Sequence, residues 1–498
     1  MNKRELLSSI TFGQRVAEEE SNELSSYFVE TDHWRRIYSG EVDVVYGPKG
    51  SGKSALYSLL LTRANEILDR NVILAAAENP RGAPAFRDLI IDPPASEREF
   101  VGLWKLYFAS LLHSVFDEYG IIGREATQLQ DALAREGLVR GRRSLQGLLT
   151  AVWEYARAAI RPQSLEAGVE IDPVTQLPKG FKGKITFQEP SAAGTAAGLS
   201  SVDHLLELAN NALHSYSNFS IWILLDRLDV AFAENTELEQ NALKALFRVY
   251  LDTLGFSNIR LKIFLRTDIW NRLSAGGFRE ASHITRHMTI DWNRNSLLNL
   301  VVRRAIHNEP LRQYYQIDLT TVLQSTASQE DFFYRLSPDQ VDVGPNKPRT
   351  FDWILSRTRD GTGKNAPREL IHLLNSLREV QIRRLEIGEA EPENHRLFVR
   401  AAFKAALPEV SRVRLEQTLY AEYPSLRERL EQLRGTKTLH NPKTLASIWS
   451  LPIEQTTALA QQLTNVGFFE QRGTREAPEY WIPFLYRDSL DLIQGAAE

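Results

Sequence analysis

Short runs of β-branched and aromatic residues alternate with amphipathic stretches between residues 42 and 307. The strand-like runs lie at residues 42–46, 72–77, 221–225, 261–265 and 287–290. Apolar positions spaced three to four apart predict helices over residues 54–65, 100–116, 201–216, 237–254 and 295–307. Strands separated by helices favour a parallel sheet that is covered on both faces. We therefore expect an α/β core.

The pattern differs in the other parts of the chain. Residues 120–200 show weaker periodicity and end in a loop-like stretch, GFKGKITFQEPSAAGTAAGLS, so we treat them as an insertion with a mobile end. After residue 307 the pattern is mostly helical up to residue 400. The last hundred residues show helix patterns at 441–449 and 453–466, followed by GFFEQRGTREAPEYWIPFLY. This order predicts two helices and a β-hairpin in a winged-helix-like unit.

The composition is that of a soluble globular protein, with 43% hydrophobic and 24% charged residues. The absence of Cys excludes disulfides, thiolate metal sites and a cysteine nucleophile. The start lacks the apolar run of a signal peptide, and no stretch approaches the roughly 20 apolar residues of a membrane span, so we expect a cytoplasmic protein. The net charge is −4, so nucleic-acid binding would need a local basic face.

Residues 47–54, GPKGSGKS, match the phosphate-loop pattern G-x-x-x-x-G-K-[ST] in full and lie between a predicted strand and a predicted helix. The glycines let backbone N–H groups curl around a β-phosphate, and the helix amino end adds positive potential. Lys53 would reach the β- and γ-phosphates, and the Ser54 hydroxyl would bind Mg²⁺. The alternative is a glycine-rich turn that caps a helix. The predicted nucleotide-binding set is Gly47, Pro48, Lys49, Gly50, Ser51, Gly52, Lys53 and Ser54.

A carboxylate follows the apolar run IWILL at residues 221–225. Asp226 is the Walker B candidate for the Mg²⁺ site, and an Asp that caps the next turn is the alternative. Many ATPases of this type place a Glu directly after this Asp to polarise the attacking water, but here that position is Arg227, which accepts no proton. Either Asp229 or a residue elsewhere does this job, or hydrolysis is slow, which suits a nucleotide-dependent switch. Asp229 as a structural salt-bridge partner is the alternative.

Two arginines are candidates for contacts with the γ-phosphate. Arg266 ends the predicted fourth strand and is followed by Thr267 and Asp268, at the edge where open α/β sheets bind ligands. Arg368 lies in NAPREL, residues 365–370, behind a Pro that opens a helix, and would fold over the triphosphate from a helical lid. The alternatives are loop capping around Arg266 and a solvated surface position for Arg368.

The motifs GPKGSGKS, IWILLDRLD, FLRTD and NAPRELIHLLN, in this order and spacing, resemble those of AAA-like and STAND-type P-loop ATPases. The nearest group is one of bacterial stand-alone ATPases with a YFVET…W…I…G…VVYGPKGSGKSALY leader. The resemblance implies that ATP binding drives assembly or a conformational switch, and that related proteins recur in prokaryotic defence against phages and mobile elements. We expect an N-terminal helical leader (1–40), a P-loop core (41–308) with an insertion at about 120–200, a helical lid (309–400) and a winged-helix-like domain (401–498).

The tail favours a protein partner over DNA. A DNA-reading helix normally carries basic or amide side chains, whereas residues 452–465 contain no Lys or Arg, although Gln461 and Gln462 would reach bases. DNA stays an alternative because of a basic cluster upstream, which comprises Arg429, Arg434, Lys437 and Lys443. Trp481 or Phe484 at the surface would support a protein interface, and burial in the wing is the alternative.

Together these patterns predict an ATP- and Mg²⁺-binding P-loop ATPase that hydrolyses ATP slowly. It would act as a nucleotide-dependent switch or assembly module and associate with itself or with a protein effector. ATP is favoured over GTP because residues 344–349, GPNKPR, lack the Asp that reads guanine. Two alternatives stay open: an ATPase whose turnover DNA stimulates, and a scaffold that binds ATP without hydrolysing it.

Overall fold

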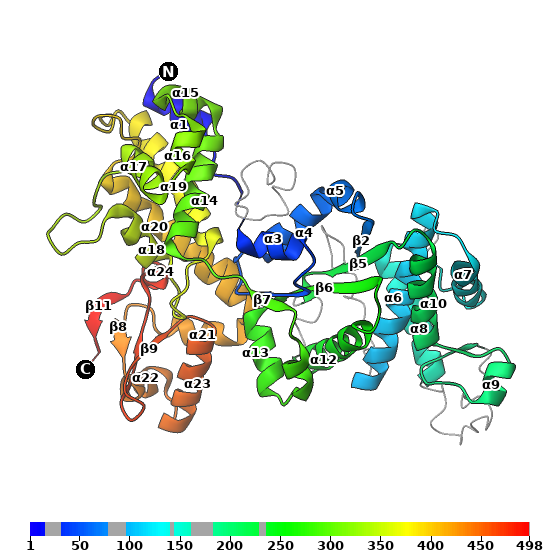
Figure 1. Cartoon of the computed structure of the whole chain (residues 1–498). Coiled ribbons are helices and arrows are strands. Elements are labelled where there is room, and N and C mark those ends of the chain that lie inside the picture. The colour runs from blue at the N-terminus through cyan, green and yellow to red at the C-terminus, as the bar shows by residue number, and fades with distance from the viewer. Residues whose placement is uncertain (15–30, 78–95, 140–143, 161–182, 229–235, 498) are drawn as a thin grey trace. The chain divides into compact units, whose positions relative to one another are not determined.

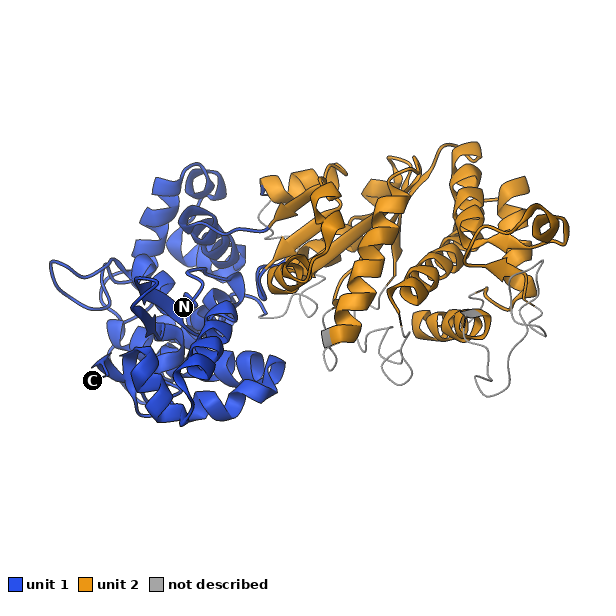
Figure 2. Ribbon diagram, turned by 90° about the horizontal axis from the view of Figure 1, so that it is seen from below, with its two compact units in different colours: residues 1–31, 48–52, 290–498 blue, residues 32–47, 53–289 orange. Residues whose placement is uncertain are grey.

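The structure is a computed structural model that describes residues 1–14, 31–77, 96–139, 144–160, 183–228 and 236–497. Its internal contacts divide the chain into two compact units (Figures 1 and 2). The sheet unit consists of residues 32–47 and 53–289, and the C-terminal unit of residues 1–31, 48–52 and 290–498. The four-part division expected from the sequence stays a prediction.

Five strands form the central sheet of the sheet unit, in the order β2-β5-β6-β1-β7. Every neighbouring pair is parallel. The strands are β1 (Val44–Gly47), β2 (Val72–Ala76), β5 (Ser220–Leu225), β6 (Ile259–Arg266) and β7 (His287–Thr289). Each overlaps one of the predicted strands, so the parallel α/β fold expected from the alternating pattern is confirmed.

Helices cover both faces of this sheet. Figure 1 shows two on one face, α4 (Lys53–Thr62) and α5 (Ala64–Leu68), and two on the other, α12 (Thr236–Thr253) and α13 (Thr267–Ala275). Tyr57 of α4 packs edge-on against Phe264 of β6, with ring centroids 5.8 Å apart. Tyr46 of β1 stacks on Trp270 of α13 at 4.8 Å. Both faces of the strands are therefore apolar, which explains why they are continuous hydrophobic runs in the sequence.

The stretch 120–200 differs from the loop-rich insertion that the weak pattern suggests. It contains α7 (Arg124–Arg135) and α8 (Leu145–Ile160), which pack on the long helix α6 (Glu97–Tyr119) within one hydrophobic core. The buried residues of α7 are Ala126, Leu129 and Leu133, spaced three and four apart in an otherwise polar helix. The part expected as a loop holds β3 (Ile185–Thr186), α9 (Ala192–Ala196) and β4 (Ser200–Ser201). Of the stretch 180–200, only residues 180–182 lie outside the described residues.

The C-terminal unit is mainly helical, as predicted for residues 307 to 400. Its longer helices share one hydrophobic core. They are α14 (Arg294–His307), α17 (Thr326–Leu336), α18 (Thr350–Thr358), α19 (Pro367–Glu386) and α20 (Arg400–Arg414). The N-terminal helix α1 (Lys3–Ser9) packs on α19, and the Lys3 ammonium donates to the carbonyl oxygen of Asn394 at 2.7 Å. The first residues of the chain thus complete a core built from its second half.

The tail contains the elements that its sequence predicts. Helices α22 (Pro442–Trp449) and α23 (Ile453–Asn465) precede a hairpin of β9 (Glu470–Gly473) and β10 (Pro478–Trp481). With β8 (Lys437–His440) and β11 (Ile493–Ala496), the hairpin forms a sheet in the order β11-β8-β10-β9. Among the described helices, none combines the length and the apolar character needed to cross a bilayer.

A network of buried charges lies at the amino end of β1 in the central sheet. Lys262 Nζ on β6 lies 2.7 Å from Asp43 Oδ1, and Arg286 Nε lies 2.6 Å from Asp43 Oδ2. The side chains of Lys262 and Asp43 are 1% and 2% exposed. Burial lowers the pKa of Lys262 to about 8, so the ammonium is still mostly protonated at neutral pH. One carboxylate therefore pairs with two cations where the chain enters β1.

We expect Asp43→Asn to lower the free energy of unfolding by about 3–5 kcal/mol, because it leaves a buried ammonium without its anion. Urea unfolding followed by circular dichroism measures this loss. Asp131→Asn is the matched control, since Asp131 forms an ion pair with Arg135 in which both side chains are more than half exposed. Equal unfolding curves for the two variants would contradict the assignment of Asp43.

Candidate functional site

The sheet brings three sequence-predicted site residues to one edge. Gly47 of β1 pairs with Arg266 of β6, and Leu225 of β5 pairs with Ile263 of β6. Strand β6 lies between β1 and β5. Because parallel strands end at the same edge, the loop after Gly47 leaves the sheet on the same side as Asp226 and Arg266. Open α/β sheets bind their ligands at this edge.

The loop between β1 and α4 has the backbone of an anion-binding loop. Gly50 and Gly52 have φ angles of +78° and +99°, which residues with a Cβ rarely adopt. The Ser51 N–H donates to the Pro48 carbonyl oxygen at 3.2 Å and closes a tight turn. Successive N–H groups in such a turn form a concave donor site ahead of a helix amino end. The predicted loop therefore has the local geometry that its glycines imply.

Lys53 and Ser54 open α4, directly after this loop. Lys53 is 9% exposed, and its Nζ donates to the Gly47 carbonyl oxygen at 2.8 Å, which folds the side chain back along the loop. Ser54 is half-buried. An ammonium and a hydroxyl are the groups that bind phosphate oxygens and Mg²⁺ respectively, so these residues fit both ligands. No cluster of three or more His, Cys, Asp or Glu side chains that could hold a metal ion occurs in the described ranges.

Asp226, the Walker B candidate, follows β5 and is 4% exposed. The next residue, Arg227, has a φ angle of +58°, a left-handed conformation that is uncommon in residues other than Gly. Backbone strain of this kind concentrates at functional sites. Asp229, the candidate for activating water, lies outside the described residues.

Arg266 is already paired on its own strand end. Its Nε and one Nη lie 3.0 and 2.8 Å from the two carboxylate oxygens of Asp268. Thr267 Oγ1, between them in sequence, is buried and has no hydrogen-bond partner among the described residues. Asp268 therefore partly neutralises the charge that Arg266 would offer to a phosphate. The Thr267 hydroxyl can form a hydrogen bond with a polar ligand.

Two contacts to the loop were not predicted, and both lie within the C-terminal unit. Trp292 Nε1 donates to the Ser51 carbonyl oxygen at 2.8 Å. The Lys49 ammonium forms an ion pair with the Glu422 carboxylate. These partners are separated in sequence by 241 and 373 residues, so no local pattern could have indicated them.

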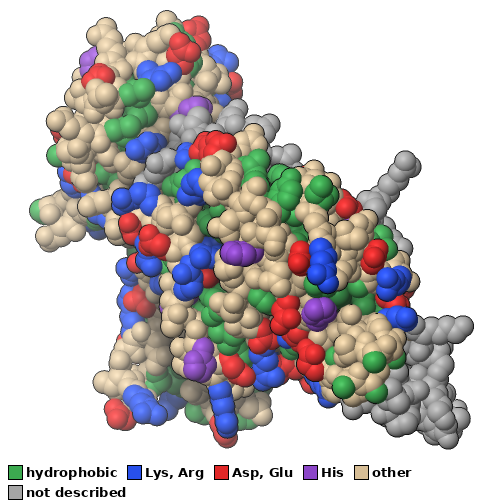
Figure 3. All heavy atoms as spheres, turned by 45° about the vertical axis from the view of Figure 1, so that its right-hand side comes forward, with side chains coloured by type: hydrophobic (Ala, Val, Ile, Leu, Met, Phe, Trp, Pro, Cys, Tyr) green, Lys and Arg blue, Asp and Glu red, His purple; other side chains and the backbone are tan. Residues whose placement is uncertain are grey.

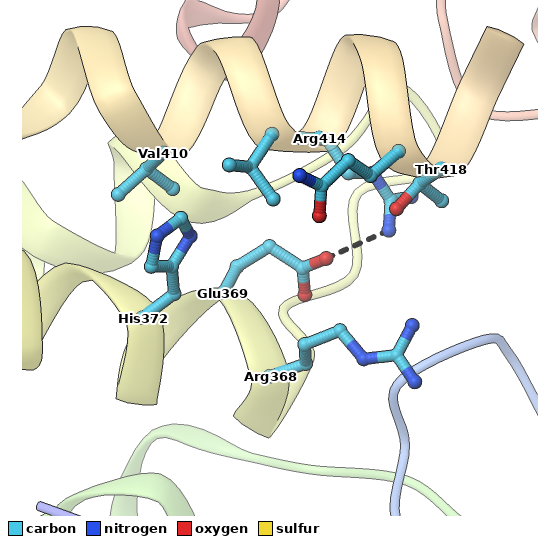
Figure 4. Close-up of a pocket in the computed structure, with 8 residues that line it drawn as sticks. Arg368, Glu369, His372, Val410, Arg414 and Thr418 are labelled. Atoms are coloured by element: carbon cyan, nitrogen blue, oxygen red, sulfur yellow. Dashed lines mark hydrogen bonds and ion pairs between the residues drawn. The ribbon is translucent and has the colours of Figure 1, made fainter. Parts of the chain in front are cut away.

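Arg368, the candidate arginine of the helical lid, lies in the first turn of α19 and belongs to the C-terminal unit with residues 48–52. A Cβ atom added to Gly50 would lie 3.0 Å from Arg368 Cβ, so the backbone of the loop and the start of α19 are in close contact. Arg368 also borders a cleft of about 180 Å³ between α19 and α20 (Figure 4). Figure 4 shows Glu369 directed toward Arg414 and Arg368 directed away from it.

The start of α19 is anchored through Glu369. Arg414 Nη1 on α20 lies 2.8 Å from Glu369 Oε1, and Arg414 Nε donates to the Tyr486 hydroxyl at 3.4 Å. Burial raises the pKa of Tyr486, so this hydroxyl stays neutral and accepts the hydrogen bond. All three side chains are buried. The position of the helix turn that carries Arg368 therefore depends on α20.

Comparisons with known proteins add little to this geometry. No protein-family model matches the chain, and no curated protein matches it. The solved structures that resemble it include the ORC2 protein of Aeropyrum pernix, determined as ADPNP-ADP complexes. The two share 13% identity over 95% of this chain and 91% of that chain, with a TM-score of 0.29. A TM-score this low carries no argument, so the fold assignment rests on the strand pairings themselves.

We expect Gly50→Ala to destabilise the protein by about 1–3 kcal/mol, because a Cβ there is strained and meets Arg368. Gly363→Ala is the matched control: Gly363 has a similar φ angle of +80°, but its added Cβ meets no atom within 4 Å. The difference between the two thermal unfolding midpoints isolates the contact with Arg368. Equal unfolding midpoints for Gly50→Ala and Gly363→Ala would show that Arg368 moves aside without any loss of stability.

Proposed function

We propose that the protein is an ATP- and Mg²⁺-binding P-loop ATPase that acts as a nucleotide-dependent switch or assembly module. The observation that carries this proposal is the loop at residues 47–54. It follows a central parallel strand, has glycines with positive φ at two positions and ends in a buried lysine that opens a helix. The full motif and its backbone geometry together favour a phosphate-binding loop over a turn that only caps the helix.

The residues take the following roles in this proposal. The loop N–H groups and Lys53 bind the phosphates, and Ser54 and Asp226 provide oxygen ligands for Mg²⁺. Bound Mg²⁺ would neutralise charge on the phosphate oxygens as the terminal phosphate leaves. Arg368 would contact the triphosphate from the lid helix α19, whose first turn lies close to Gly50.

Slow hydrolysis fits the residues that follow Asp226. Arg227, directly after Asp226, cannot accept a proton from water. Arg266 is engaged with Asp268. We therefore propose a turnover below about 1 s⁻¹, the lower end of the usual range for enzymes. Such an ATPase stays loaded long enough to act as a switch.

A protein partner or a second copy of the chain fits the tail better than DNA does. In the upstream basic cluster, Arg434 pairs with Glu431 at 2.9 Å and with Asp491 at 3.0 Å. On the face shown in Figure 3, basic and acidic side chains are intermixed among the described residues. Trp481 and Phe484 are partly buried, neither fully exposed nor enclosed. The role in prokaryotic defence rests only on the resemblance of the motifs.

We expect Lys53→Ala to weaken ATP binding about 10- to 100-fold, since it removes a charge-assisted contact to phosphate. Isothermal titration with ATP and Mg²⁺ measures this loss, and Lys347→Ala, a change at an exposed lysine, should bind as the wild type does. Light scattering in the same samples records whether ATP changes the assembly state. Absence of ATP binding in the wild type would overturn the proposal.

We expect double-stranded DNA to leave the turnover unchanged at moderate salt, because α23 carries no Lys or Arg and Arg434 of the upstream cluster is already paired with Glu431 and Asp491. Steady-state hydrolysis with and without DNA, at two salt concentrations, checks this. Turnover that rises with DNA and falls steeply with salt would instead establish the DNA-associated alternative.

A further inference from the structure

One helical segment of the C-terminal unit reaches both the loop and the start of α19. It comprises α20, the π-helical segment η4 (Leu415–Tyr420) and a last helical turn that includes Glu422. Arg414, at the end of α20, holds Glu369 beside Arg368. Glu422, after the π-helical segment, holds Lys49 of the loop. Two ion pairs from one helix therefore act on two different parts of the candidate site.

The ion pair of Glu422 is partly shielded from water. The side chains of Lys49 and Glu422 are 29% and 15% exposed, whereas those of Arg412 and Glu416, on the same helical segment, are 47% and 52% exposed. Exposed pairs contribute little and are screened by salt, but partly buried pairs are screened much less. The ion pair between Glu422 and Lys49 therefore contributes more to holding the loop than an exposed pair would.

The π-helical segment sets the position of Glu422 relative to Arg414. A π turn has i→i+5 hydrogen bonds and changes the direction in which later side chains leave the helix, and such turns are frequent at functional sites. Gln417 and Thr418 of this segment line the same cleft as Arg368. The unusual turn therefore lies at the point where the helix passes from one contact to the other.

We propose that Glu422 is a positioning residue of the nucleotide site, which holds the loop through Lys49 and opposes the binding of phosphate. This inference rests on the proposed function. Phosphate at the loop brings negative charge close to the Glu422 carboxylate, so the two anions compete for the same lysine. Phosphate bound at the loop then weakens the ion pair between Glu422 and Lys49. By reciprocity, this ion pair lowers the affinity of the loop for phosphate.

The test compares Glu422→Gln with Glu416→Gln in the full-length protein. Glu416 pairs with Arg412 at the surface of the same segment, so its variant removes a charge from this segment without touching the loop. Without nucleotide, hydrogen exchange of a peptide covering residues 48–52 should be about three- to tenfold faster in Glu422→Gln than in wild type, and unchanged in Glu416→Gln. ATP and ADP should bind Glu422→Gln several-fold more tightly, with a larger gain at low salt.

Two further results decide between the outcomes. Lys49→Gln should speed exchange of the loop to the same extent, and the double variant should add nothing, because both changes remove one pair. Unchanged exchange in Glu422→Gln would overturn the proposal, as would faster exchange with unchanged nucleotide affinity, which is the result of a merely structural pair. If the wild type binds no nucleotide, the proposed function fails, while the exchange data still show whether Glu422 holds the loop. Circular dichroism confirms that each variant is folded.

Discussion

The carboxyl ends of all strands in a parallel sheet lie at the same edge, and the candidate site depends on this constraint. With β6 between β1 and β5, the chain leaves the sheet at three adjacent points of the same edge. Two of these three exits pass through residues with positive φ, namely Gly50 and Gly52 after β1 and Arg227 after β5. These uncommon backbone conformations therefore lie where strands of the sheet end.

Much of this arrangement could be predicted because it is encoded locally. Buried parallel strands need apolar side chains on both faces, so continuous runs such as IWILL indicate them directly. The GPKGSGKS loop is also local, since its glycines, its lysine and the helix that follows are consecutive in sequence. Even the pairing of Arg266 with Asp268 joins residues two positions apart, and a closer inspection of the sequence would have suggested it.

The rest could not be predicted because it joins distant segments. The ion pair of Lys49 with Glu422 spans 373 residues, and that of Asp43 with Lys262 spans 219. A lone Glu or Lys in a sequence is usually a surface charge, and only the fold shows which ones are buried together. For α7 the reason is different: its pattern is local but sparse, since only Ala126, Leu129 and Leu133, spaced three and four apart, are buried in an otherwise polar helix.

The two ion pairs of the helical segment 400–422 differ in how they respond to a new anion. Arg414 is 9% exposed and has Glu369 at 2.8 Å and Asp360 at 3.6 Å, so two carboxylates already surround it. Breaking such a buried pair is strongly unfavourable, because an uncompensated charge stays behind. Lys49, by contrast, belongs to the loop whose N–H groups attract anions, and its carboxylate partner lies nearer the surface. Under the proposed function, the Arg414 pair would stay intact, and the Glu422 pair is the one that a bound phosphate would displace.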